Sequence, residues 1–108
     1  MLQLPKDYLS YISAGGCDSG FTSGDPGYFQ LWAPDEVDGL NRDYRAQEFA
    51  PGFVGFGSDG GGEMLAFDAA GAVYMIPFIG GGSKDAKKIA SNWSEVAARI
   101  STDDEVQR

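Results

Sequence analysis

Residues 55–68 read GFGSDGGGEMLAFD and contain both a nucleotide-binding motif and the reason to reject it. Gly55, Gly57 and Gly60 fit the pattern G-x-G-x-x-G, which binds a dinucleotide when a helix follows at once and receives the pyrophosphate at its N-terminus. Here the residues EMLAFD have the apolar character of a strand, and the turn residues AAG and a second apolar run follow them. Because the helix dipole that would bind the phosphates is missing, we expect no dinucleotide at this loop.

The same residues predict two successive hairpins with a defined register. A four-residue loop at residues 59–62 would place Ser58 opposite Glu63, and the three-residue loop AAG, with its glycine in the left-handed position, continues the pairing into the next strand. The expected facing pairs are Val54 with Phe67, Phe56 with Leu65, Phe67 with Val73 and Leu65 with Met75. One face then collects Val54, Phe56, Leu65, Phe67, Val73 and Met75, and the other holds Gly55, Gly57, Met64, Ala66, Tyr74 and Ile76. Burial of the first, larger face fixes the register, because a slip of one residue would scatter its side chains over both faces.

Two groups of glycines predict special surroundings for the backbone. Gly55 and Gly57 make one face of the meander flat, and glycine in a strand often marks the close approach of other atoms. We expect either a closely packed helix or an open shallow surface on this face. The run at residues 60–62 predicts backbone conformations with positive φ.

Helical patterns flank the meander on both sides. Pro5 opens the first, an aromatic strand at residues 28–32 follows it, and Pro34 opens a second short helix. Near the end of the chain, Asn92 and Glu95 have the spacing of a capping box. The apolar stripes are Leu4, Tyr8, Tyr11 and Ile12 in the first helix and Trp93, Val96, Ala97 and Ile100 in the last, where we expect fraying beyond Ser101. The sequence therefore predicts an α+β fold with a mainly antiparallel sheet, a central meander, and N-terminal and C-terminal helices.

Length and composition indicate a single domain that spans residues 1–108. The chain is 43% hydrophobic and 13% aromatic, enough for a core of its own. Cys17 has no second cysteine to pair with, so we expect it to be a small packed residue in a reducing compartment. The uncharged run at residues 69–83 is too short for a membrane helix, and no secretory leader pattern is present. We expect a soluble, cytoplasmic protein.

Candidate catalytic groups are few. The chain has no histidine, so neither a Ser-His-Asp nor a Cys-His nucleophile can be assembled, and a Cys/His metal cluster is excluded. Asp59 and Glu63 flank the glycine loop and could form an acid/base pair, but an aspartate that starts a turn and a solvated strand end explain them better. We expect Trp32 and Trp93 to anchor the core and the sheet, and we expect no catalytic, cofactor-binding or metal-binding residue.

The net charge of −8 lies entirely between residues 18 and 68. Within this range only Arg42 and Arg45 offset the acidic residues Asp18, Asp25, Asp35, Glu36, Asp38, Asp43, Glu48, Asp59, Glu63 and Asp68. Such a field repels nucleic acid and attracts basic partners. Solubility alone would also explain it.

Three segments together resemble the SUKH superfamily, the domain of fungal Smi/Knr-type cell-wall regulators and of many bacterial immunity proteins. They are the opening LPKDYLSYISAGG, the central FGSDGGGEMLAFD followed by VYMIPFIG, and the closing IASNWSEVAARI. The resemblance implies helices packed on a mainly antiparallel sheet and a non-catalytic domain that neutralises a cognate secreted toxin, often a nuclease. Members usually have a further, often helical, stretch before the Leu-Pro and a larger apolar residue where Ala97 stands.

We therefore expect a cytoplasmic immunity protein that occludes a toxin with a basic domain, and no binding to nucleic acid or membrane. The alternatives are a regulatory adaptor of the Smi/Knr type with an endogenous partner and, third, an enzyme or small-ligand binder that uses the glycine loop. The identity of the toxin and the oligomeric state stay open. The candidate contact residues are the acidic side chains Asp35, Glu36, Asp38, Asp43, Glu48, Asp59 and Glu63.

Overall fold

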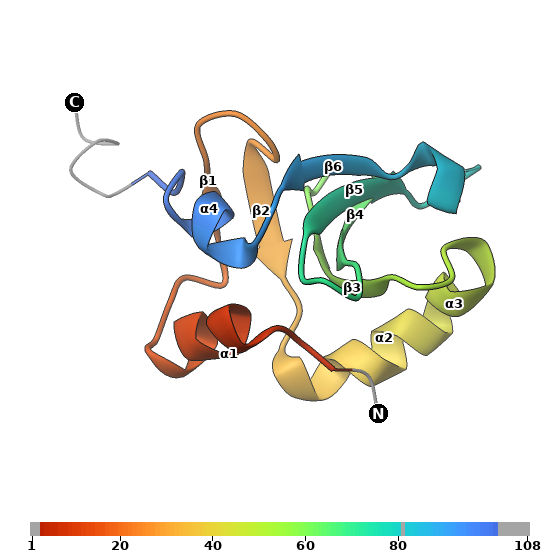
Figure 1. Cartoon of the computed structure of the whole chain (residues 1–108), viewed down its shortest axis with the longest axis horizontal. Helices are drawn as coiled ribbons and strands as arrows, with labels where there is room; N and C mark the ends of the chain where they lie inside the picture. Colours follow the sequence, from red (N-terminus) through yellow and green to blue (C-terminus); the bar gives the residue numbers. More distant parts are fainter. Residues whose placement is uncertain (1–2, 81, 102–108) are drawn as a thin grey trace.

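One curled antiparallel sheet organises the chain in the computed structural model, which describes residues 3–80 and 82–101 (Figure 1). Its strands lie side by side in chain order: β1 (Ser19–Phe21), β2 (Tyr28–Leu31), β3 (Val54–Ser58), β4 (Glu63–Phe67), β5 (Val73–Pro77) and β6 (Lys87–Ala90). The helical elements are α1 (Lys6–Ser13), η1 (Pro34–Glu36), α2 (Val37–Asp43), α3 (Ala46–Phe49), η2 (Ser83–Asp85) and α4 (Trp93–Ala97). The α+β class with terminal helices is confirmed. The helical connection between β2 and β3 is longer than the single short helix that the sequence predicts.

Both hairpins of the meander use the same turn. The Asp59 carboxylate oxygen Oδ1 accepts hydrogen bonds from the backbone N–H groups of residues 61 and 63, at 2.8 and 3.1 Å. Oδ1 of Asp68 accepts from the N–H groups of residues 70 and 72, both at 2.9 Å. Each loop ends in a glycine at positive φ, Gly62 at 109° and Gly71 at 87°. The role of Asp59 as a turn former is confirmed, and so is positive φ within residues 60–62, at Gly60 and Gly62.

The register of β4 and β5 is the expected one, but that of β3 and β4 is only half right. Phe67 faces both Val54 and Val73, as the sequence predicts. Towards the glycine loop the pairing differs, because a β-bulge between Gly55 and Gly57 shifts β3 by one residue. Observed pairs there are Gly57 with Leu65 and Ser58 with Met64, in place of Phe56 with Leu65 and Ser58 with Glu63. The loop is correspondingly shorter, residues 60–62, since the N–H of Asp59 already bonds the carbonyl of Glu63 at 3.1 Å.

The two faces of the meander are both buried, each in its own core. Helices α1 and α4 cover one face, and their core contains Tyr8, Phe29, Leu31, Phe56, Leu65, Phe67, Val73, Met75, Ala90, Trp93 and Val96. The segment around α3 covers the other, with a core of Ala46, Ala50, Met64, Ala66 and Ile76. The flat face therefore lies against a helical segment and is not an open surface. A Cβ at Gly55 would come within 2.5 Å of the Met64 sulfur. Gly57 does not share this face as the sequence predicts, because the bulge places it opposite Leu65, whose side chain belongs to the other core.

The helix ends follow the sequence signals except at α4, and the expectation for Cys17 is wrong. Gly15 has φ of 83° just after α1, and the N–H of Glu95 donates to Oδ1 of Asn92 at 3.0 Å, which is one of the two bonds of a capping box. The Glu95 carboxylate accepts instead from the N–H of Ser91, one residue before the cap, at 2.7 Å. Helix α4 nevertheless ends at Ala97, since Ile100 leaves the helix to form a bridge with Thr22. Cys17 is exposed and not packed, because it lies in the loop that follows the glycines after α1. The fraying expected beyond Ser101 concerns residues outside the described ranges.

The segment after α4 ties the two edges of the sheet together. Its backbone bonds the β1 side, where the N–H of Ser23 donates to the carbonyl of Arg99 at 2.9 Å. The Arg99 guanidinium donates to the carbonyls of Asp25, in the β1–β2 loop, and Ile89, in β6, at 2.9 and 3.0 Å. Lys87 of β6 also forms a 3.0 Å ion pair with Asp25. These bonds hold the curl of the sheet. Within residues 3–80 and 82–101, no helix combines the length and apolar character that crossing a membrane requires.

Asn41 attaches α2 to the sheet. Its side chain is 2% exposed; Nδ2 donates to the carbonyls of Val37 and Gly55, at 2.7 and 2.8 Å, and Oδ1 accepts from the N–H of Gly55 at 2.8 Å. The last β2–β3 backbone bond runs from the Trp32 N–H to the Phe56 carbonyl, so strand pairing stops just before Gly55. The amide of Asn41 thus supplies the donor and the acceptor that a neighbouring strand would have supplied.

Replacing Gly62 tests the turn geometry. A Cβ at Gly62 meets nothing within 4 Å, so Gly62→Val strains only the backbone at φ 109°. We expect it to lower the free energy of unfolding by about 1–3 kcal/mol. Gly61→Val is the matched control, because Gly61 has no positive φ and its Cβ would make an ordinary 3.6 Å contact with Asp59. Denaturant unfolding of both variants measures the difference; equal losses would contradict the assignment of strain to position 62.

Replacing Asn41 tests the attachment of α2. Asn41→Leu has a similar volume but leaves the buried N–H and C=O of Gly55 without partners, so we expect a loss of about 2–4 kcal/mol in the free energy of unfolding. Arg42→Leu, at the exposed neighbouring position of the same helix, should change stability by less than about 0.5 kcal/mol. If the two variants melt together, the Asn41 bonds do not hold the helix.

Candidate protein-binding surface

The seven predicted contact residues fall into two groups in the structure. Asp35 and Glu36 lie in η1, Asp38 and Asp43 in α2, and Glu48 in α3, whereas Asp59 and Glu63 lie at the β3–β4 turn. The first group therefore belongs to the helical connection between β2 and β3. The second belongs to the hairpin.

The hairpin group is engaged in the fold. The Asp59 carboxylate bonds two backbone N–H groups of its own turn, and Glu63 is a half-buried strand residue opposite Pro77. A carboxylate whose acceptor capacity serves a turn is less available to a partner than one that faces solvent. The hairpin pair is therefore the weaker part of the predicted contact set.

The helical group is mostly exposed. Asp35, Glu36, Asp43 and Glu48 face solvent, while Asp38 is half-buried and interacts within the fold. Glu48 lies 3.8 Å from Arg45 in an exposed ion pair, which contributes little to stability. Asp35 and Glu36 occupy the first turn after Pro34, where the positive end of the helix favours acidic side chains. The helical connection thus presents a local excess of negative charge.

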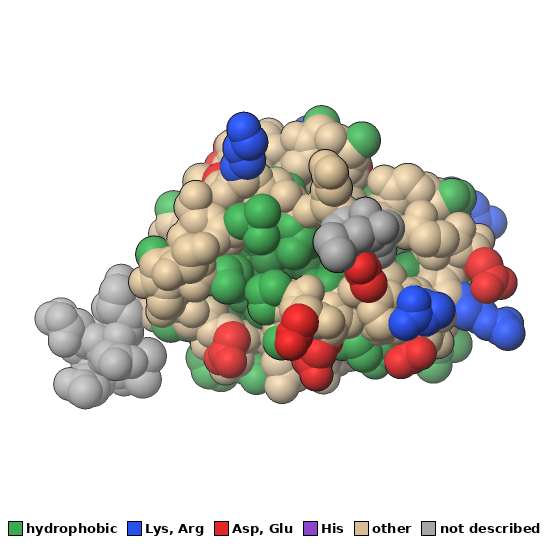
Figure 2. Space-filling model, turned by 90° about the horizontal axis from the view of Figure 1, so that it is seen from below, with side chains coloured by type: hydrophobic (Ala, Val, Ile, Leu, Met, Phe, Trp, Pro, Cys, Tyr) green, Lys and Arg blue, Asp and Glu red, His purple; other side chains and the backbone are tan. Residues whose placement is uncertain are grey.

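A groove lies beside these acidic residues, between α1 and the η1–α2 segment, with a volume of about 660 Å³. Its lining consists of Gln3, Leu4, Lys6 and Leu9 on one side and Pro34, Asp35, Val37 and Asp38 on the other. Figure 2 shows hydrophobic side chains gathered in a hollow on this face of the molecule, with acidic side chains along its border. We call this hollow the α1–η1 groove. It combines apolar contact area with negative charge.

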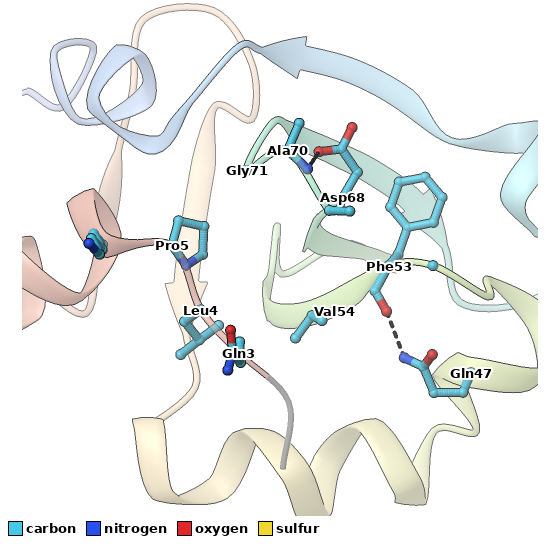
Figure 3. Close-up of a pocket in the computed structure, with 12 residues that line it drawn as sticks. Gln3, Leu4, Pro5, Gln47, Phe53, Val54, Asp68, Ala70 and Gly71 are labelled. Carbon is cyan, nitrogen blue, oxygen red and sulfur yellow. Dashed lines mark hydrogen bonds between the residues drawn. The ribbon is translucent and has the colours of Figure 1, made fainter.

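A second hollow, of about 600 Å³, lies on the other side of the N-terminal segment (Figure 3). Pro5 lies beside the β4–β5 turn at Gly71, and Val54 and Phe53 lie at the start of β3. Two of its polar side chains already bond the fold: Asp68 bonds its turn, and Nε2 of Gln47 donates to the carbonyl of Phe53 at 2.7 Å. Gln3, Leu4 and Lys6 line both hollows, so the N-terminal segment separates them.

Sequence reasoning found the acidic residues of the α1–η1 groove but missed its apolar ones. Leu9 is 42% exposed and lies off the apolar stripe by which α1 packs on the core. An apolar side chain outside the stripe of an amphipathic helix was the available signal. The sequence does not indicate that Val37 and Pro34 line the groove, because they lie near α1 only through the tertiary fold.

Aromatic side chains of α1 and α4 carry two buried polar atoms and two tyrosine hydroxyls with raised pKa values. The Tyr8 hydroxyl and the Trp93 indole N–H are buried without a hydrogen-bond partner, and burial raises the pKa of Tyr8 well above its ordinary value. Burial also raises the pKa of Tyr11 to about 12, with the nearby Cys17 and Asp18 charges as smaller causes. Both hydroxyls stay neutral at physiological pH. Among residues 3–80 and 82–101, no cluster of three or more Cys, Asp or Glu side chains is placed to hold a metal ion.

Comparison with known proteins gives one positive finding. The sequence model of the SMI1 / KNR4 family (SUKH-1) matches residues 1–99, which is nearly the whole chain and includes every strand and helix described above. No curated protein sequence matches the chain significantly. The family match agrees with the three sequence segments and with the helix-covered antiparallel sheet. The chain belongs to the SMI1/KNR4 family (SUKH-1).

Proposed function

We propose that this domain is a non-catalytic immunity protein that acts in the cytoplasm, binds a cognate secreted toxin with a basic surface, such as a nuclease, and neutralises it by occlusion. Membership of the SUKH-1 family fits this role. The observation that carries the proposal is the α1–η1 groove, in which exposed acidic residues of η1 border an apolar floor. A surface of this kind suits contact with another protein.

The charge of the domain supports a basic partner. An enzyme that cleaves nucleic acid must bind phosphates, and it does so with lysine and arginine side chains. A protein with a net charge of −8 attracts such a surface over a long range and increases the rate of encounter. Short-range apolar contacts in the groove would then slow dissociation.

The alternative function is a regulatory adaptor of the Smi/Knr type, which would use the same surface on an endogenous partner. Gene neighbourhood separates the two, because an immunity gene normally lies beside the gene of its toxin. A basic toxin encoded next to this chain favours immunity. An unrelated cellular partner that co-purifies favours the adaptor.

Charge reversal at η1 tests the proposal. The double variant Asp35→Lys and Glu36→Lys should associate with the toxin encoded next to it several-fold more slowly at low ionic strength. The difference should shrink at 0.5 M salt, where the Debye length is about 4 Å. Asp38 is left unchanged, because it already takes part in an interaction. The measurement is association kinetics of the two purified proteins against salt concentration.

The matched control is the double variant Asp18→Lys and Asp85→Lys. It changes the net charge by the same amount at exposed positions that line neither hollow. Both double variants should melt close to the parent, since exposed substitutions usually change stability by less than about 0.5 kcal/mol each. Association rates that ignore salt, or that fall equally in both variants, would argue against a localised acidic contact.

A further inference from the structure

The α1–η1 groove has the chemistry of a specific receptor site, which deepens the proposed function and rests on it. We propose that the groove receives a partner segment in which one or two large apolar side chains are flanked by lysine or arginine. The apolar part would fill the floor of the groove, and the basic part would meet the acidic border formed by η1.

The apolar requirement comes from Leu9. Helix α1 packs on the core through Tyr8, Tyr11 and Ile12, whereas Leu9 lies outside that core cluster and is 42% exposed. Val37, 2% exposed, forms part of the groove across from it. Exposed apolar area beside a buried floor is the arrangement that accepts an anchoring side chain of a partner.

The charge requirement comes from the border. Among the described residues that line the groove, Lys6 is the one cation, against the carboxylates of Asp35 and Asp38, and the exposed Glu36 lies next to them in the chain. An acidic segment would therefore meet net repulsion at this border, whereas a basic one would form charge-assisted contacts. Charge complementarity selects a basic occupant.

The size and rigidity of the groove fit such a segment. A volume of about 660 Å³ lies within the range of roughly 300–1,000 Å³ that is typical of small-ligand sites, so it has room for large side chains. Its walls are fixed from below: Asn41 bonds α2 to Gly55, and the ring of Tyr8 packs edge-on to Phe56 and Trp93 at 5.0 and 5.1 Å. A preformed site costs little ordering when a partner binds.

The experiment uses a defined probe, the acetylated and amidated hexapeptide KKFLKK, titrated into the uniformly ¹⁵N-labelled full chain. We expect concentration-dependent shifts of backbone amide signals at Leu4, Leu9 and Val37 that saturate together. The peptides EEFLEE and KKSGKK remove the basic and the apolar component in turn, and each should bind at least about fivefold more weakly. Shifts that centre elsewhere, or equal binding of all three peptides, would overturn the proposal.

Two matched pairs of variants locate the contact. Leu9→Ser should weaken KKFLKK binding about fivefold, whereas Ile79→Ser, at a 93% exposed apolar residue outside the groove, should leave it unchanged. Asp35→Asn should weaken KKFLKK binding, and its binding should depend less on salt than that of the parent. Asp85→Asn should change neither the affinity nor its salt dependence. All four substitutions are at exposed positions, so the fold should persist in each. Equal effects within either pair would show that the groove is not the receptor.

Binding of the toxin to the variants distinguishes a failure of the groove proposal from a failure of the proposed immunity function. If the toxin binds the parent and Leu9→Ser equally well, the immunity role stands and the groove is not its contact site. If KKFLKK binds the groove but no basic partner co-purifies, the groove stands and the immunity role fails. A concentration-dependent dimer that disappears in Leu9→Ser would identify a second copy of the chain as the occupant and overturn the basic-partner proposal.

Discussion

The bonds between the Asn41 amide and the backbone of Gly55 are the constraint on which the helical side of the structure depends. Strand β2 leaves β3 at Trp32, so the N–H and C=O of Gly55 would be buried without partners. Asn41 supplies both partners from α2, and the side chains of Met64 and Trp32 leave little room for a side chain at position 55. One amide therefore completes the sheet and fixes the helix that precedes α3. It thereby also fixes one wall of the α1–η1 groove.

The meander was predictable from sequence because its turns are local. Asp59 and Asp68 each bond backbone groups two and four residues ahead, and a glycine at positive φ closes each loop, so a window of five residues contains the whole turn. The bulge at residues 55–57 was not predictable. It adds a residue to β3 while the loop loses one, and the large apolar residues stay on the same face either way. Hydrophobic pattern alone cannot separate the two registers.

The candidate site was predictable only in its charge. Counting acidic residues identifies the chain segment, but the structure divides them by what they do: Asp59 and Asp68 build turns, Asp25 pairs with Lys87, and Asp35 and Glu36 face solvent. The apolar half of the groove arises where α1 meets η1 and α2, across about 25 residues of chain. No short stretch of the sequence contains both segments, so the sequence pattern does not show that they lie together. Asn41 was missed for the same reason, since its bonds span 14 residues.

The structure separates the residues that hold the fold from those that shape the groove. Tyr8, Asn41 and Gly55 are fixed by packing or by buried hydrogen bonds, and changing any of them disturbs the core. Leu9, Asp35 and Glu36 are exposed and take no part in the core, so substitutions there leave the core contacts intact. A binding domain that must match a particular partner needs such a division, because its contact chemistry can then change without loss of stability. The rigid floor supplies preorganisation, and the exposed border supplies specificity.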